Sequence, residues 1–215
     1  MAPMLTVICC GIPRSGSTWL FNATRLVVAH AYKNVRAGWH RDIADQGAAD
    51  AVVMKMHDFE PDTPADKVLL SHRDIRDIIV SGQSMGWAPN DAGLLDFGRV
   101  ARRQHDMWST RADLDLPYEQ IVGDPVAALK RIAETLGVDL SNDHLQSIAA
   151  AIPTKAEDVD DRGHNATTLI HQGHVTDGRA GRWQGQLSDH IVAAVTEEHG
   201  DWLIKQGYSV DIDPH

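Results

Sequence analysis

Cysteine is scarce in this chain, since its 215 residues contain two, Cys9 and Cys10. The two are neighbours in one short apolar run, and adjacent side chains of a strand point to opposite faces. This placement argues against both a disulfide framework and a metal site built on paired thiols. We expect the two thiols to be buried and structural, as free cysteines usually are.

Long apolar runs and an excess of basic residues are also missing. The longest apolar stretches are strand-like and far shorter than the roughly 20 residues that cross a bilayer. No basic region precedes an apolar segment at the N-terminus, so we expect a cytoplasmic protein without a membrane partner. The net charge of -10 opposes nucleic-acid binding, which needs a basic surface. An anionic ligand stays compatible with this charge, provided that cations gather locally.

The composition is that of an ordinary globular protein, with 43% hydrophobic and 23% charged residues. A chain of this length can bury one substantial core and is short for two. We therefore expect a single domain over residues 1–215. Its oligomeric state leaves no sign in the sequence.

Apolar runs that do not alternate with polar residues predict strands buried on both faces, at 5–10, 51–56, 67–71 and 114–118. Helical periodicity and capping residues predict helices at 17–31, from 74 onward, 95–111, 125–136, 141–152 and 188–205. This alternation indicates an α/β fold with three layers, a central parallel sheet flanked by helices. Two polar segments, 32–46 and 153–187, carry no predicted element, and so long a loop as the second is usually functional.

A phosphate-binding loop is predicted between the first strand and the first helix. Residues 11–18 have the sequence GIPRSGST, whose frame is close to the nucleotide-binding P-loop. Backbone N–H groups of such a loop and the positive end of the helix hold an oxyanion. The lysine expected after the second glycine is Ser17, and Arg14 supplies a cation instead. Phosphoryl transfer relies on that lysine and on Mg²⁺, whereas a sulfuryl group carries less charge and needs a metal less.

One residue further, the pattern becomes more specific. Residues 13–19, PRSGSTW, resemble the P-K-S-G-T-T-W loop of the sulfotransferases that use 3′-phosphoadenosine 5′-phosphosulfate (PAPS). The resemblance implies a P-loop NTPase-like sulfotransferase fold, PAPS as co-substrate and no metal. It implies that Trp19 stacks on the adenine, and that Arg14 takes the place of the family's catalytic lysine. It also assigns the 5′-phosphate to the loop, namely Arg14, Ser15, Gly16, Ser17 and Thr18.

A second block, residues 71–81 with the sequence SHRDIRDIIVS, follows the third predicted strand. It resembles the family's 3′-phosphate site, an arginine at a strand end and a serine eight residues later, here Arg73 and Ser81. An arginine gives two charge-assisted bonds to a phosphate, and a serine two helical turns on adds a hydroxyl. The alternative is that Arg73 pairs with Asp74 or Asp77 on the surface.

A third block, Lys55-Met56-His57, ends the second predicted strand and resembles the family motif K-T-H. The resemblance implies that His57 is the general base on an acceptor hydroxyl and that Lys55 donates to the sulfuryl group. A histidine can remove such a proton near neutral pH. Open α/β sheets bind ligands at strand ends, which favours His57 among the 12 histidines of the chain.

Two further segments match less closely. The sequence around Tyr118 resembles the family's Y-E-D-x-x-x-D-P, which implies that Tyr118 hydrogen-bonds the adenine. Residues 178–183, GRAGRW, resemble the C-terminal R-K-G-x-x-G-D-W-K that closes over the 3′-phosphate, and imply roles for Gly178 and Arg179. The preceding Arg-Lys pair is Thr176-Asp177 here, and either Arg179 or Arg182 could compensate.

The acceptor is expected to be a small molecule or a glycan with a free hydroxyl. Its pocket is expected from the loops at 33–47, 83–95 and 155–175, and three tryptophans could line it or pack elsewhere: Trp39, Trp87 and Trp108. A metal site is not expected from the Gly-rich loop that holds His164, His171 and His174. Two other functions remain open, a P-loop small-molecule kinase and a non-catalytic nucleotide-binding protein.

Overall fold

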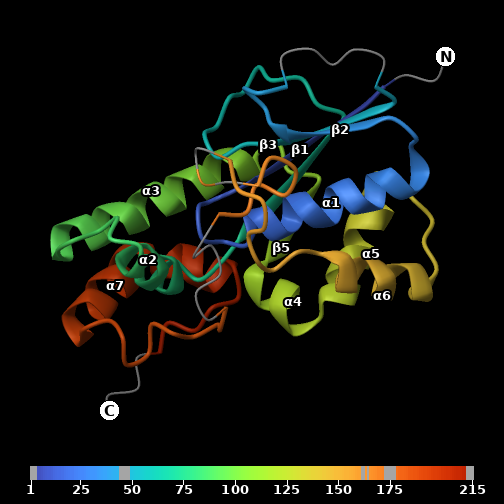
Figure 1. Cartoon of the computed structure of the whole chain (residues 1–215). Helices are drawn as coiled ribbons and strands as arrows, with labels where there is room; N and C mark the ends of the chain where they lie inside the picture. The colour runs from blue at the N-terminus through green and yellow to red at the C-terminus, as the bar shows by residue number, and fades with distance from the viewer. Residues whose placement is uncertain (1–3, 44–48, 161–162, 164, 172–177, 212–215) are drawn as a thin grey trace.

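The computed structural model describes residues 4–43, 49–160, 163, 165–171 and 178–211. Its centre is one all-parallel sheet in the order β2-β3-β1-β4-β5. The strands are β1 (Leu5–Gly11), β2 (Val35–Trp39), β3 (Ala51–Lys55), β4 (Lys67–His72) and β5 (Leu114–Pro117). Helices cover both faces (Figure 1), so the predicted three-layer α/β fold is confirmed.

The central strand β1 pairs with β3 on one side and β4 on the other. Its side chains alternate between two apolar cores, as the geometry of a strand requires. Cys9 belongs to the core beneath α1 (Ser17–Ala31), and Cys10 to the core beneath α3 (Asp91–Ser109). Both thiols are free and buried, as predicted.

The helices divide into two groups (Figure 1). On one face α1 packs with α5 (Pro125–Leu136) and α6 (Asn142–Ala151), and their apolar side chains form a single cluster with the sheet. The other group is α3 with α2 (Ile75–Ser84) and α7 (Asp189–Lys205), which share a second core. The chain thus brings α2, at the end of β4, beside its own last helix.

Helix ends follow the local sequence signals. Asp124 caps α5 with Pro125 in the first turn, and Gly137 ends that helix in the left-handed conformation. The side-chain oxygen of Ser141 accepts from the backbone of α6, as predicted. The predicted helix at 95–111 begins earlier, at Asp91, because the Asn90 side chain caps it.

Two elements were missed by the sequence analysis. Strand β2 lies inside the polar segment 32–46; it pairs with β3 alone, so as an edge strand it needs no continuous apolar run. The short helix α4 (Tyr118–Gly123) spans six residues, too few for a periodic pattern to stand out. None of the helices in the described part of the chain is long and apolar enough to span a bilayer.

Candidate functional site

A cavity of about 470 Å³ lies at the carboxyl edge of the sheet. Every strand delivers a lining residue there, at its last position or just beyond it: Trp39, Lys55, Pro13, Arg73 and Tyr118. Most of the predicted site residues line the same cavity: Arg14, Gly16, Ser17, Thr18, Trp19, Lys55, His57, Arg73, Tyr118 and Gly178. The structure therefore gathers blocks that are far apart in the sequence into one space.

The loop from β1 to α1 lines the cavity with Pro13, Arg14 and Gly16 and leads into the first turn of α1. Gly16, just before α1, has a φ of 86°, and a Cβ there would lie 3.0 Å from the ring of Tyr118, so this position requires glycine. The first turn of α1 has no side-chain cap and no acidic residue. Its N–H groups, beginning at Ser17 and Thr18, are therefore suited to an anion.

Ser15 has a different role from its neighbours in the loop. Its hydroxyl is fully buried and bonds the carbonyl of Ile12 at 2.7 Å and Ser71 of β4 at 3.0 Å. The side chain of Ser15 thus fastens the loop to the sheet, and it does not line the cavity.

Lys55, the last residue of β3, connects the end of that strand to the loop. Its ammonium donates a hydrogen bond to the hydroxyl of Thr18 and lies 4.9 Å from the ring centre of Trp39. Burial lowers the pKa of Lys55 from 10.5 to about 7, because the charged form loses its hydration. An anion bound in the cavity would restore the charge of this side chain.

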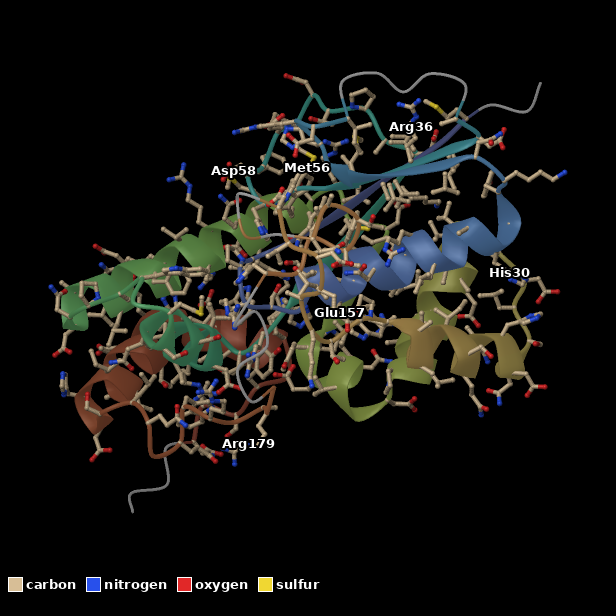
Figure 2. The ribbon with its side chains drawn as sticks, in the orientation of Figure 1. His30, Arg36, Met56, Asp58, Glu157 and Arg179 are labelled. Atoms are coloured by element: carbon tan, nitrogen blue, oxygen red, sulfur yellow. The ribbon has the colours of Figure 1, made fainter. Side chains whose placement is uncertain are left out.

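His57 lies two residues beyond, with Nδ1 at 2.8 Å from the carbonyl oxygen of Gly11. Burial, and secondly the charge of Lys55, lower the pKa of His57 to about 4, so the ring is neutral at pH 7. Its ring lies 5.3 Å from that of Trp39. Figure 2 shows Met56 and Asp58, the sequence neighbours of His57, where the chain leaves β3.

Arg73 and Asp77 form an ion pair at 3.2 Å, with side-chain exposures of 5% and 0%. Arg73 does pair with Asp77, but the pair is buried, so the alternative that Arg73 forms an ion pair on the surface is wrong. The guanidinium of Arg73 also donates to the carbonyl of Arg179 at 2.6 Å and lies 4.1 Å from the ring centre of Tyr118. Its Nε is buried and has no hydrogen-bond partner among the described residues. Such an orphaned donor beside a cavity points to an anionic ligand.

Ser81 and Arg179 do not line the cavity themselves. Ser81 is buried on α2, and its hydroxyl accepts from Nε of Arg14 at 2.8 Å. The Arg179 side chain is exposed, although its backbone carbonyl accepts from Arg73. The Tyr118 hydroxyl donates to the carbonyl of Gly178 at 2.8 Å. The role of each of these residues toward a nucleotide stays a prediction.

The structure also adds apolar lining residues that the sequence analysis missed, namely Ile121 and Val122 of α4 and Pro153. Leu169 and Ile170 also line the cavity, from the segment 155–175 that was expected to contribute to the acceptor pocket. No motif marks them. Of the three candidate tryptophans, Trp39 and Trp87 line the cavity, whereas Trp108 is fully buried in the core and donates to the carbonyl of His57 at 2.9 Å.

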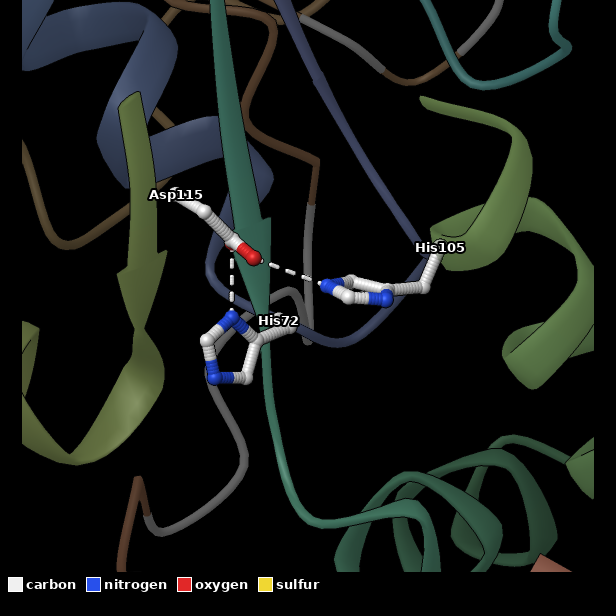
Figure 3. Close-up of side chains that lie close together, drawn as sticks. All are labelled: His72, His105 and Asp115. Carbon is white, nitrogen blue, oxygen red and sulfur yellow. Dashed lines mark hydrogen bonds and ion pairs between the residues drawn. The ribbon is translucent and has the colours of Figure 1, made fainter. Parts of the chain in front are cut away.

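A second cluster of titratable groups lies between β4, β5 and α3. Asp115 accepts from Nδ1 of His72 at 2.6 Å and from Nε2 of His105 at 2.9 Å (Figure 3). The spacing of the three groups would suit a metal ion. However, the indole N–H of Trp202 can only donate, at 3.0 Å, to Nδ1 of His105, so Nε2 of that ring carries the proton. These hydrogen bonds form without a metal and join β4, β5, α3 and α7.

The histidines considered for a metal in the sequence analysis lie elsewhere. His171 lines the cavity, while His164 and His174 lie outside the described residues.

The architecture is that of the sulfotransferase fold. Retinol dehydratase with androsterone and the inactive cofactor PAP matches with a TM-score of 0.67 and 17% identity, over 98% of this chain and 84% of that one. Retinol dehydratase with retinol and PAP matches with a TM-score of 0.62 and 16% identity, over 98% of this chain and 84% of that one. Mouse sulfotransferase SULT7A1 with PAP matches with a TM-score of 0.61 and 14% identity, over 94% of this chain and 87% of that one. No protein-family model and no curated protein matches the sequence.

Proposed function

We propose that the chain is a PAPS-dependent sulfotransferase that transfers a sulfuryl group to a hydroxyl of a small-molecule acceptor. The observation that carries this proposal is the meeting, in one cavity, of an uncapped helix start, Lys55, a neutral His57 and Arg73. The helix start binds an anion, and Lys55 neutralises charge. His57 accepts a proton, and Arg73 binds a second anion. A bisphosphorylated nucleotide with an activated sulfate requires all four.

In this proposal PAPS lies across the strand ends. The 5′-phosphosulfate occupies the loop from Arg14 to Thr18, and the 3′-phosphate contacts Arg73. The adenine lies between Trp19 and Tyr118, which both line the cavity. Ser81 supports the 3′-phosphate side through its hydroxyl, which already lies at 2.8 Å from Nε of Arg14. One domain, residues 1–215, supplies all of these groups.

The proposed chemistry is an in-line displacement at sulfur. Nε2 of His57 takes the proton of the acceptor hydroxyl while the acceptor oxygen forms a bond to sulfur. The bond from sulfur to the bridging oxygen of the 5′-phosphate breaks, which leaves a sulfate ester and 3′,5′-adenosine bisphosphate (PAP). Lys55 and Arg14 stabilise the negative charge that develops on the bridging oxygen. No metal takes part in this scheme.

The walls of the cavity favour an acceptor with an apolar body over a glycan. Trp39 and Trp87 line it, together with the apolar residues of α4 and of 153–171. Burying a sugar against them would leave several hydroxyl groups without partners, which costs free energy. The small, largely apolar molecules named in two of the matching structures, androsterone and retinol, are consistent with this preference.

Calorimetric titration tests the proposal. The chain should bind PAP in the presence of a chelator and bind ATP much more weakly. ATP binding that appears only with Mg²⁺ would favour the kinase alternative, for which the loop lysine is missing at Ser17. Tight PAP binding without transfer to any of a panel of phenols and alcohols would favour a non-catalytic nucleotide-binding protein.

A further inference from the structure

Asp77, on α2, accepts hydrogen bonds from two separate parts of the chain. Its carboxylate is fully buried and takes one bond from Arg73 at 3.2 Å. It takes two more from backbone N–H groups in the C-terminal segment, from Gly181 at 2.7 Å and from Trp183 at 2.9 Å. A carboxylate is well suited to such a junction, because its two oxygens accept several bonds at once. Asp77 thus ties residues 178–183 to Arg73.

Arg182 is the residue between the two N–H groups that Asp77 holds. Its backbone position is therefore fixed relative to Arg73. The guanidinium of Arg182 donates to the side chain of Gln186 at 3.3 Å, and its Nε is buried. On the C-terminal side, the guanidinium of Arg76 packs over the ring of Trp183 at 3.9 Å. The segment is thus anchored on both sides of Arg182.

The charges in this region are positive and close together. The pKa of Arg14 is lowered, first by burial and then by the neighbouring charges of Arg73 and Arg182. Arg73 and Arg182 therefore both lie near enough to Arg14 for their charges to act on it, although Arg182 does not itself line the cavity. Their mutual repulsion would be offset by an anion with two negative charges, such as a phosphate monoester.

We propose that Arg182 is an additional ligand of the nucleotide 3′-phosphate and that Asp77 is the positioning residue that brings it to Arg73. This inference rests on the proposed function. In the motif that residues 178–183 resemble, the cations stand before the first glycine, where this chain has Thr176-Asp177. The residue before the motif's tryptophan is an aspartate, and this chain has Arg182 there. Arg182 supplies the cation from the other end of the segment.

The test compares two nucleotides that differ in the 3′-phosphate. Calorimetry would measure PAP and 5′-AMP binding to the wild type, to Arg182→Gln and to Arg103→Gln, which removes an exposed charge on α3 as a matched control. Arg182→Gln should weaken PAP binding about tenfold or more while 5′-AMP binding changes less than about twofold, because one charged phosphate bond is lost. Arg103→Gln should change neither.

Asp77→Asn tests the positioning role. It should reduce the preference for PAP over 5′-AMP, and adding Arg182→Gln should cause little further loss, since both changes remove the same contact. Additive losses would mean that Asp77 acts independently of Arg182, through its ion pair with Arg73 or through stability, and would overturn its positioning role toward Arg182. If Asp77→Asn does not fold, Arg182→Gln still decides the assignment of Arg182.

Three outcomes separate the inference from the proposed function. A wild type that prefers PAP, with the preference intact in Arg182→Gln, would overturn the inference and leave the proposed function standing. Loss of the preference in Arg179→Gln instead would assign the cation to Arg179. A wild type without any preference for PAP over 5′-AMP would remove the proposed function and this inference together.

Discussion

Nδ1 of His57 lies 2.8 Å from the carbonyl oxygen of Gly11, the last residue of β1. A carbonyl can only accept, so Nδ1 carries the proton and Nε2 of the neutral ring keeps its lone pair. The same glycine begins the phosphate loop. One hydrogen bond therefore fixes both the tautomer of the proposed base and its position relative to the loop that would hold the transferred group.

The first prediction concerns His57 as the general base. His57→Asn can still donate to the carbonyl of Gly11 through its amide but cannot take a proton. We expect the rate of sulfuryl transfer to fall by about 10²- to 10⁴-fold, the usual contribution of a general base. PAP affinity, measured by calorimetry, should stay within about twofold. A variant that turns over at the wild-type rate would exclude His57 as the base.

The second prediction is a bell-shaped pH dependence of kcat/KM. The base form of His57 exists above its pKa of about 4, so activity rises with pH through that value. The charged form of Lys55 exists below its pKa of about 7, so activity falls as pH rises through that value. Bound PAPS is anionic and raises the pKa of Lys55, so the alkaline limb of kcat should lie at higher pH than that of kcat/KM.

Lys55→Met supplies the control for the alkaline limb. It should lower kcat/KM at neutral pH and abolish the decline near pH 7, because no group titrates at this position. An alkaline limb that persists unchanged in this variant would have to be assigned to another group.

The local blocks of the site could be predicted from the sequence because each is continuous in the chain. The loop at 13–19, Lys55 with His57, and Arg73 all follow apolar strand runs, and parallel strands end at a common edge. That physical rule alone brings these groups together. It also explains why Tyr118, just after β5, lines the same cavity.

The remaining parts depend on packing between distant segments, which no local pattern records. Asp77 was considered only as a surface partner of Arg73, yet it is fully buried and accepts hydrogen bonds from residues 181 and 183, more than a hundred positions away. Ile121 and Val122 line the cavity from α4, a helix too short to show periodicity. The sequence alone does not distinguish Trp108 from Trp39. Trp108 lies in the core because α3 turns its side chain toward the sheet.

The third prediction concerns Trp87, which lines the cavity from the loop between α2 and α3 and is 48% exposed. Trp87→Ala removes apolar surface from the proposed acceptor side. We expect KM for an apolar phenol or alcohol to rise about tenfold, with PAP affinity unchanged. Ile204→Ala is the matched control, because Ile204 is an exposed apolar residue of α7 at 63% exposure and does not line the cavity. An equal rise in KM in both variants would contradict a role for Trp87 in acceptor binding.

The fourth prediction concerns the stability of the fold in acid. Burial alone would raise the pKa of Asp115, but hydrogen bonds from His105 and His72 outweigh burial and lower it from 3.8 to about 2. The ionised carboxylate therefore stabilises the folded state fully above about pH 4, and this contribution is lost as pH falls from about 4 to about 2. A shift of this size corresponds to about 2 kcal/mol.

Asp115→Asn provides the measurement. Its amide can accept from one imidazole but turns a donor toward the other, so we expect the free energy of unfolding at pH 7 to fall by about 2 kcal/mol or more. Urea unfolding at several pH values should show the difference from the wild type shrinking as pH drops from 4 toward 2, because the wild-type carboxylate becomes protonated. Asp139→Asn, at an exposed carboxylate, should show no such pH-dependent difference. A constant difference for Asp115→Asn across that range would mean that the two imidazole bonds do not depend on the charge of Asp115.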